Sequence, residues 1–446
     1  MMKSARNLNS DDIRTLALAS LGGALEFYDF IIFVFFTAEI SHTVLPSEMS
    51  PWLATTWTYG IFAAGYLMRP IGGVVMAHLG DKLGRKRIFT FSVLLMSLAT
   101  LGMAFVPTYN HFGILSPLVL LACRMMQGLA VGGEVPGAWT FVAEHVPERH
   151  VGLSTGVLTS GLSLGILIGS FIAFAINHIV HNNVLPWPEN VTDFWGWRVA
   201  FIIGGIFGLI AVWLRRFLEE TPIFKELKRK KALSKEIPLK VVLTKYLGSV
   251  VVAVLLTWTL SATVMISTLL TPNYMKAAPY YYSGDITLAA NSITSFFLIL
   301  GTPVAGFLCD RFGSGKFFTF SGIVFAGVSY IFYHCAGYST ALFFVLSAFL
   351  GFFAGYVGSV AYVIVRSFPA TVRFSGLSFS YNIAYAVFGG LTPWAINLMQ
   401  PVFPMFHMWY LIIISLLASL VGLYLIFYGE KKQMPIGIEE LETKDL

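Results

Sequence analysis

The sequence predicts an all-α membrane protein with twelve transmembrane helices in two six-helix bundles, and three observations lead there. The 446 residues are 56% hydrophobic and only 12% charged, with a mean hydropathy of +0.74, whereas a soluble domain carries about 25% charge. Twelve apolar runs reach the length of about 20 residues that a helix needs to cross a bilayer. Two short sequence signals from the first half recur in the second half.

The apolar runs are expected to be helices because lipid offers no hydrogen-bonding partner to an open strand edge or a loop. Their ends are placed to within about four residues. The expected spans are 16–40, 52–78, 88–106, 114–143, 152–178, 197–217, 246–274, 286–309, 317–336, 341–366, 374–398 and 405–428.

The distribution of Lys and Arg predicts the orientation. Basic residues gather in the loops after spans 2, 4, 6, 8 and 10, including ten between residues 215 and 245. The alternate loops contain only Lys276, and Arg198 stands at the outer start of span 6. Because basic loops stay in the cytoplasm, both termini are predicted to lie there.

A charged segment divides the chain. We expect an N-terminal bundle over 1–215, a linker over 216–245, a C-terminal bundle over 246–430 and a tail over 431–446. The apolar side chains within the linker allow an amphipathic helix at the membrane surface. A solvated charged linker explains the same residues, and both interpretations stay open.

The two halves share signals at matching places. Asp81 and Gly84 after span 2 correspond to Asp310 and Gly313 after span 8. The loops after spans 4 and 10 each contain a Pro followed by Arg and Gly. A parallel repeat of six spans is typical of transporters whose site lies between the halves near the bilayer midplane.

The loop after span 2, "GDKLGRKR", resembles the signature of the major facilitator superfamily, with Ala77 in place of its first Gly. The resemblance implies a cytoplasmic gate that opens and closes as the halves rock against each other. The gate residues that it implies are Asp81, Gly84 and Arg85, with Asp310 and Arg311 as counterparts in the second half.

Four further stretches narrow the resemblance to the bacterial metabolite:proton symporters: "GALEFYDF", "RPIGG", "RMMQGLAVGGE" and "WGWR". That family includes carriers of proline and betaine, 2-oxoglutarate, citrate and shikimate. The resemblance implies a multi-pass protein of the bacterial inner membrane. Span 5 lacks the Pro of an antiporter element, and the tail is shorter than in osmosensing betaine carriers.

Five charged residues are candidates in the interior of the first four spans, away from the span ends. A charge at the bilayer centre costs about 2.5–3.5 kcal/mol on the insertion scale. Three acids face two arginines, so one carboxyl lacks a full counter-charge and is suited to bind a proton. Asp29 and Glu134 are the leading proton-site candidates, with Glu26 as a third.

Arginine can bind a substrate carboxylate with two parallel hydrogen bonds. Arg124 and Arg69 are therefore predicted substrate anchors. On a continuous span 4, Arg124, Gln127 and Glu134 share one stripe, which we expect to face a central cavity. The competing interpretation is that the five charges form fixed salt bridges between spans 1, 2 and 4.

The second half offers aromatic and amide side chains instead of charge. Aromatic faces attract ammonium groups, so these residues are predicted to bind the substrate. Packing within the bundle or at the membrane interface explains any single one of them equally well. The candidates are Trp258, Tyr356, Tyr381, Asn382 and Tyr385.

These features predict proton-coupled symport of a small organic acid or zwitterion. A proton-driven antiporter that exports a drug or metabolite is the alternative, and a membrane protein without transport is a third. No catalytic, zinc or nucleotide motif predicts an enzyme. We expect a monomer with no cofactor, metal or nucleic-acid partner. Two deep arginines and three competing acids favour a zwitterion or monocarboxylate.

Overall fold

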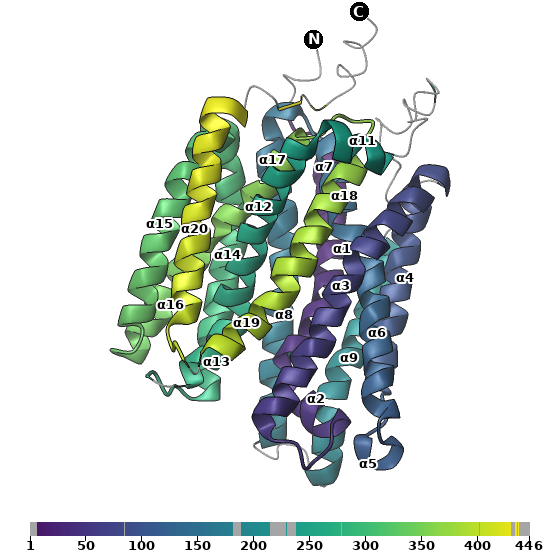
Figure 1. Ribbon diagram of the computed structural model, residues 1–446, viewed down its shortest axis with the longest axis vertical. Helices are drawn as coiled ribbons and strands as arrows, with labels where there is room; N and C mark the ends of the chain where they lie inside the picture. The colour runs from purple at the N-terminus through teal and green to yellow at the C-terminus, as the bar shows by residue number, and fades with distance from the viewer. Residues whose placement is uncertain are drawn as a thin grey trace, which may run out of the picture.

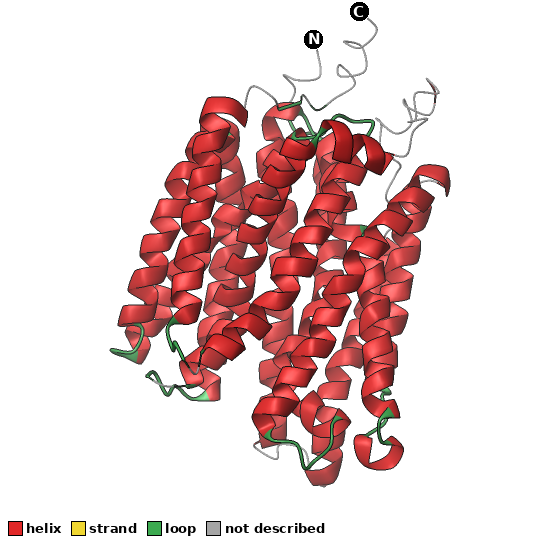
Figure 2. Cartoon of the chain, in the orientation of Figure 1, coloured by secondary structure: helices red, strands yellow, loops and turns green. Residues whose placement is uncertain are grey.

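The computed structural model describes residues 7–83, 85–181, 189–214, 229, 238–277, 279–400, 402–429, 433–434 and 436. These residues form a bundle of long, roughly parallel helices whose loops lie at its two ends (Figure 2). We call the end where α1 begins and α20 finishes the inner end, and the opposite end the outer end (Figure 1).

The predicted spans of the first half all correspond to helices. Span 1 is broken at Phe36, and span 4 is broken at Gly132–Gly133. In chain order the helices are α1 Ser10–Phe35 with α2 Thr37–Val44, α3 Pro51–Leu83, α4 Arg85–Ala104, α5 Tyr109–Phe112, α6 Leu115–Val131 with α7 Glu134–His145, α8 Val151–His181 and α9 Glu189–Leu214.

The second half also follows the prediction, but four of its spans contain 3-10 or π-helical segments. Its helices are α11 Pro238–Lys245, α12 Leu247–Val264 with α13 Thr271–Lys276, α14 Gly284–Phe312, α15 Ser314–Cys335, α16 Thr340–Ala354 with α17 Val360–Arg366, α18 Arg373–Ala384 with α19 Gly390–Met399, and α20 Phe406–Tyr424. The irregular segments are Met265–Leu270, Gly355–Ser359, Tyr385–Gly389 and Leu425–Gly429.

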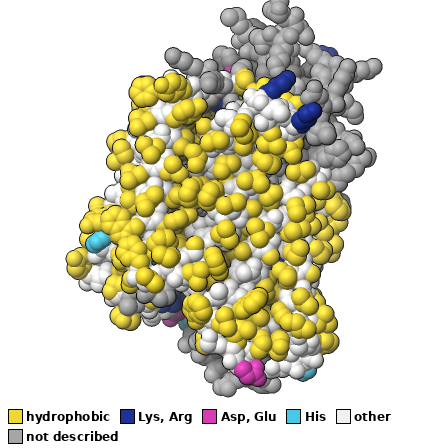
Figure 3. Space-filling view, viewed as in Figure 1, with side chains coloured by type: hydrophobic (Ala, Val, Ile, Leu, Met, Phe, Trp, Pro, Cys, Tyr) yellow, Lys and Arg dark blue, Asp and Glu magenta, His cyan; other side chains and the backbone are white. Residues whose placement is uncertain are grey.

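Length and hydropathy agree with twelve membrane crossings. Nine helical stretches of the described chain are long and apolar enough to cross a bilayer. The other three predicted spans are α3, α4, and α18 with α19. Hydrophobic side chains cover most of the face seen in Figure 3, and its charged side chains lie towards the ends. This surface suits a bilayer rather than water.

The helices fall into two groups. In the first, α1 packs on α8 and α9, and α3 packs on α6; in the second, α15 packs on α20, and α12 on α18. The groups meet along α8 with α14 and along α3 with α18 and α19 (Figure 1). The two-bundle fold is therefore confirmed, while the predicted boundaries of the bundles, linker and tail stay predictions.

Close approach of α8 and α14 depends on glycine. A Cβ at Gly152 would lie 2.5 Å from the Gly306 carbonyl oxygen, and one at Gly306 would lie 2.1 Å from the Gly152 carbonyl oxygen. Neither backbone could keep this position with a larger residue, as at small-residue crossings of membrane helices. This contact holds the two halves close together near the inner end.

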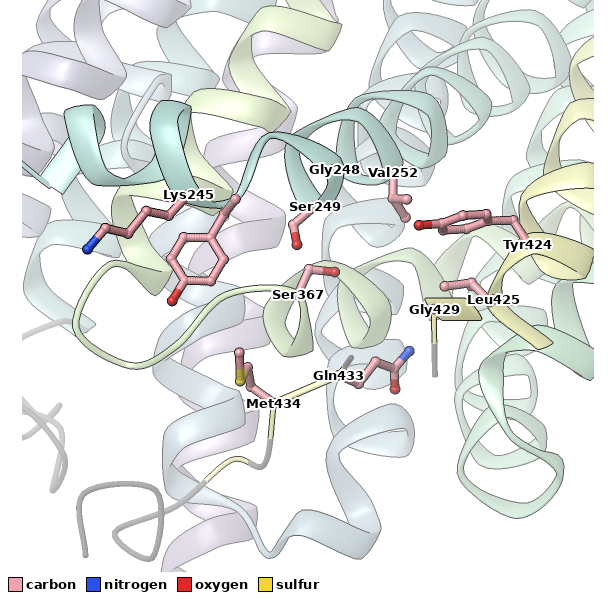
Figure 4. Close-up of a pocket in the computed structure, with 11 residues that line it drawn as sticks. Lys245, Gly248, Ser249, Val252, Ser367, Tyr424, Leu425, Gly429, Gln433 and Met434 are labelled. Carbon is pink, nitrogen blue, oxygen red and sulfur yellow. The ribbon is translucent and has the colours of Figure 1, made fainter. Parts of the chain in front are cut away.

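A short C-terminal segment returns to the inner end of the second half. The Met434 amide donates to the Arg366 carbonyl oxygen at 2.7 Å, and Gln433 Nε2 donates to Ser314 Oγ at 3.0 Å. Gln433 and Met434 line a pocket of about 450 Å³ together with the start of α12 and the end of α20 (Figure 4). The segment thus links the inner ends of spans 9 and 10. The apolar side chains predicted to form an amphipathic helix in the linker lie outside the described residues.

Candidate functional site

Arg69 of α3 lies where the two halves meet and is enclosed by tyrosine rings. Its guanidinium carbon is 4.4 Å from the ring centre of Tyr385, 5.3 Å from Tyr381 and 5.2 Å from Tyr66. Only 1% of Arg69 is exposed. The structure therefore brings together three predicted substrate-binding residues from α3 and span 11.

Further aromatic rings extend this group. The Tyr66 and Tyr385 rings are parallel, with centres 5.9 Å apart, and Trp139 of α7 meets Tyr381 edge-on at 5.1 Å. Sequence reasoning missed Tyr66 and Trp139. Tyr66 had a usable signal, because residues three apart on a helix share a face and Tyr66 precedes Arg69 by three.

Arg124 of α6 lies within the first half against different aromatic rings. Its guanidinium carbon is 4.4 Å from the centre of the Phe33 ring and 4.8 Å from that of Phe62. Its Nη1 donates to Gln127 Oε1 at 2.6 Å, and Gln127 Nε2 donates to Thr100 Oγ1 at 2.7 Å. Arg124 and Gln127 thus act as one polar unit, as their predicted shared face implies.

Asp29 is buried inside the first half, against α9. A Cβ at Gly204 would lie 2.5 Å from Asp29 Oδ1, and one at Gly208 would lie 3.1 Å from Oδ2. Gln127 Nε2 also approaches the Asp29 carbonyl oxygen at 3.4 Å, which links Asp29 to the Arg124 unit. The carboxyl therefore faces the interior of its own half rather than the second half.

Glu134 follows a turn at Gly132–Gly133 that separates α6 from α7, although both glycines keep right-handed helical backbone angles. Gln127 and Glu134 both contact α4, through Thr100 and Ser92, so they face the same neighbouring helix. Glu134 Oε1 accepts a hydrogen bond from Ser92 of α4 at 3.4 Å. Glu134 thus contacts span 3. The side chain of Glu26 lies outside the described residues.

Trp258 and Tyr356 pack inside the second half. Trp258 stacks on Phe388 with ring centres 3.9 Å apart, and its Nε1 donates to the Tyr410 hydroxyl at 2.8 Å. The Tyr356 hydroxyl lies 3.0 Å from Thr263 Oγ1. These contacts match the packing interpretation that the sequence left open for single aromatic residues.

Asn382 spans the two halves. Its Nδ2 donates to the Gly132 carbonyl oxygen at 2.5 Å, and Ser378 Oγ donates to the same oxygen at 3.3 Å. This carbonyl has no helical partner, because the residue four positions further on is Pro136, which has no backbone N–H. Asn382 therefore holds span 11 against the broken span 4.

Three polar contacts join the halves at the inner end. The Asp310 carboxylate accepts from the Gly152 and Leu153 amides, both at 2.8 Å. Arg366 Nη2 lies 2.8 Å from Glu148 Oε1. Asp310 thus makes the inter-half contact expected of a gate residue. Arg311 is exposed and lies over the Phe312 ring. Gly84 and the side chains of Asp81 and Arg85 lie outside the described residues.

The third inner contact is fully buried. Arg373 Nη1 of α18 lies 3.4 Å from Glu144 Oε1 of α7, and neither side chain is exposed. Sequence reasoning missed this pair. Its signal was the match between the loops after spans 4 and 10, in which Glu144 and Arg373 both lie.

The halves also touch towards the outer end. Asn397 of α19 donates to Thr56 Oγ1 of α3 at 3.3 Å, and Ser170 lies 3.3 Å from Ser292 Oγ. The two halves are therefore in contact on both the inner and the outer side of Arg69 and its surrounding tyrosines. Across the described residues, no cluster of three His, Cys, Asp or Glu side chains could hold a metal ion.

Sequence comparisons match transporters. The family model described as sugar (and other) transporter matches residues 15–249. The proline/betaine transporter of Escherichia coli (strain K12) is 30% identical over 432 residues, which cover 92% of this chain and 82% of that protein. The putative proline/betaine transporter of Staphylococcus aureus (strain COL) is 30% identical over 435 residues, covering 94% and 90%.

Solved structures agree on the fold. The proton:xylose symporter XylE of the major facilitator superfamily, bound to 6-bromo-6-deoxy-D-glucose, matches with a TM-score of 0.76 at 18% identity, covering 98% of this chain and 100% of that chain. The inward-open conformation of the xylose transporter XylE from E. coli matches with a TM-score of 0.66, also at 18% identity, covering 97% and 99%.

Proposed function

The chain belongs to the major facilitator superfamily, within its metabolite:proton symporter family, and we propose that it takes up a small zwitterion or organic acid together with protons. The relatives named as proline/betaine transporters support a substrate of that type. The inner end would then face the cytoplasm, in agreement with the positive-inside distribution of Lys and Arg.

The observation that carries this proposal is the meeting of Arg69 with tyrosines of the second half. A guanidinium group binds a carboxylate strongly in a desolvated site, and ring faces attract an ammonium group. A small zwitterion has both groups. Because the rings belong to both halves, a substrate held there contacts both moving parts of the carrier.

Asp29 is our first choice for the proton site. Its carboxyl is buried, and its main-chain carbonyl accepts a hydrogen bond from Gln127, which in turn accepts one from Arg124. Gain or loss of a proton on this carboxyl would change the charge balance near that arginine. Glu134 and Glu26 remain secondary candidates.

Alternating access would proceed by exchange of the contacts at the two ends. Opening outward breaks the Asn397–Thr56 bond, while opening inward breaks the Glu144–Arg373 and Glu148–Arg366 pairs and the Asp310 contacts. Substrate and proton would bind from outside with the inner contacts intact. They would leave after those contacts separate.

Transport in proteoliposomes tests the proposal. The purified protein is reconstituted, and labelled glycine betaine and proline are offered with an inward proton gradient and, separately, with none. We expect accumulation above the outside concentration only with the gradient, and its collapse when an uncoupler is added. Gradient-driven loss of preloaded substrate would identify an antiporter instead, and uptake that ignores the uncoupler would contradict proton coupling.

A further inference from the structure

An apolar groove runs along the surface of the second half, from its inner end towards the middle of the bundle. It has a volume of about 460 Å³ and is lined by α14, α15 and the end of α16. In Figure 1, α15 and α16 form the left edge of the molecule, away from the first half. The described lining residues include none of those around Arg69 and none that join the halves.

The walls of this groove are open to the surroundings of the protein. Among its lining residues, Val304 is 41% exposed and Phe320 is 72% exposed. Exposed apolar side chains that lie together on membrane-spanning helices mark a surface for contact with lipid. The groove is therefore suited to hold a hydrocarbon chain, which is more stable there than in water.

The length of the groove matches the thickness of one leaflet. Along α14 its lining residues extend from Gly301 to Phe312, a helical length of about 16 Å at 1.5 Å per residue. The hydrocarbon core of a bilayer is about 30 Å thick, so one leaflet accounts for about 15 Å. A single acyl chain of the leaflet at the inner end thus fits from the membrane surface to the midplane.

Positive charge lies at the membrane-surface end of the groove. Lys316, in the first turn of α15, is exposed and lines the groove. The guanidinium carbon of Arg311 lies 5.7 Å from the ring centre of Phe312, another lining residue. Within the described part of the chain, neither Lys316 nor Arg311 makes an ion pair. The neighbouring acid, Asp310, accepts hydrogen bonds from amides of α8 instead.

We propose that this groove binds one anionic phospholipid of the leaflet at the inner end. An acyl chain lies between α14 and α15, and the headgroup phosphate lies at Lys316 and Arg311. Basic residues at a membrane surface attract anionic headgroups, and each contributes about fivefold in affinity. A soluble phosphate would leave the apolar walls uncovered, whereas a phospholipid covers the walls and pairs with both cations. The inference goes beyond the proposed function and does not depend on which substrate is carried.

Native mass spectrometry of the detergent-purified full-length protein tests the headgroup. Dioleoyl phosphatidylglycerol is anionic, and dioleoyl phosphatidylcholine has the same chains with a zwitterionic headgroup. We expect the first phosphatidylglycerol molecule to bind at least about fivefold more tightly than the first phosphatidylcholine. Lys316→Gln should lower phosphatidylglycerol affinity about fivefold, and Lys316→Gln with Arg311→Gln about 20-fold. Equal affinities of the wild type for the two lipids would overturn the inference.

The chain offers a matched control in Lys245. This exposed lysine also lies at the inner end and lines the pocket of about 450 Å³ at the start of α12. Lys245→Gln removes the same charge at a different place, so phosphatidylglycerol affinity should stay as in the wild type. An equal loss in Lys245→Gln and Lys316→Gln would indicate general attraction by positive charge and would overturn the assigned site.

Filling the groove tests the position of the acyl chain. Val304→Trp places a large ring among the lining residues and should lower the affinity for both lipids. Ile413→Trp is the control, because Ile413 is 61% exposed on α20 and does not line the groove. Glycerol phosphate, which has the phosphate without acyl chains, should not compete with phosphatidylglycerol at millimolar concentration. Unchanged lipid affinity in Val304→Trp, or competition by glycerol phosphate, would show that no acyl chain occupies the groove.

Discussion

The two halves share a repeat but differ in where they place charge and where they distort helices. The first half holds Asp29, Arg69, Arg124 and Glu134 as buried charges in its spans, on helices interrupted only at Phe36 and Gly132–Gly133 among the described residues. The second half holds its buried Arg373 at a helix start. Four of its six spans contain 3-10 or π-helical segments.

This difference separates two tasks. Buried charges need fixed neighbours, because an ion that loses its partner in a low-dielectric site costs several kcal/mol. Regular helices and close glycine contacts supply such neighbours in the first half. Short π-helical segments frequently mark functional sites, and the one at Tyr385–Gly389 begins with a tyrosine whose ring lies against Arg69. The first half therefore supplies the buried charges, and the second half supplies helices whose backbone can change conformation.

The largest expected effect is at the proton-site candidate of the first half. Asp29→Asn keeps the shape of the side chain but removes its ionisation. We expect gradient-driven accumulation in proteoliposomes to fall about 100-fold, while exchange of labelled for unlabelled substrate without a gradient persists. Normal accumulation by this variant would remove Asp29 from the coupling scheme.

The next effect should come from the buried pair that joins the two halves. Glu144→Gln removes the negative charge opposite the buried Arg373, which keeps its hydrogen bonds to the Val365 and Phe368 carbonyl oxygens. Loss of one charge of a buried pair costs about 3–5 kcal/mol. We expect this variant to have a clearly lower Tm than the wild type. Cysteines introduced at the inner end should also react faster with a thiol reagent, because the halves separate there more often. Double replacement, Glu144→Gln with Arg373→Gln, should recover part of the stability. No recovery would show that the two charges are not coupled.

A smaller effect should follow from crowding Asp29 through its neighbour on α9. In Gly204→Ala the new Cβ would meet Asp29 Oδ1 at 2.5 Å, and overpacking of this kind costs about 1–3 kcal/mol. We expect a lower Tm and about tenfold weaker proton-driven uptake. Gly60→Ala is the matched control, because nothing lies within 4 Å of its added Cβ. Equal Tm values and equal uptake in Gly204→Ala and Gly60→Ala would show that Asp29 is not tightly packed against α9.

The smallest effect is expected at the partly exposed pair Glu148–Arg366, whose side chains are 26% and 17% exposed. Exposed ion pairs contribute about 0–1 kcal/mol and are weakened by salt. Glu148→Gln should therefore change Tm by a few degrees at most, and less at high ionic strength. A loss as large as that of Glu144→Gln would contradict the distinction between the buried and the exposed pair.

The helices were predictable because membrane spans depend on apolar length, which can be read locally. The pair Tyr381 and Tyr385 was predictable for a similar reason, since residues four apart share a helix face. Their position beside Arg69 was not predicted, because it depends on how the two halves pack against each other. The contact of Asn382 with Gly132 could not be derived, because it joins residues 250 positions apart.

The turn at Gly132–Gly133 in span 4 was not predicted. The two glycines were a visible signal of it, because glycine weakens helices, but the backbone angles stay helical there and Glu134 contacts α4 as Gln127 does. Trp258 and Tyr356 show a different limit. The sequence shows that the second half contains many aromatic residues. Only tertiary packing decides which of their rings fill the interior of that half and which face the other half.

The broken turn of span 4 has a consequence for the order of events. Separation of the halves at the inner end takes the Asn382 amide away from the Gly132 carbonyl, and a stranded carbonyl in a dry interior is costly. A water molecule is the natural replacement donor. Hydration of the Gly132 carbonyl oxygen and release of the substrate would then occur in a single step, because both require the opening between the halves at the inner end.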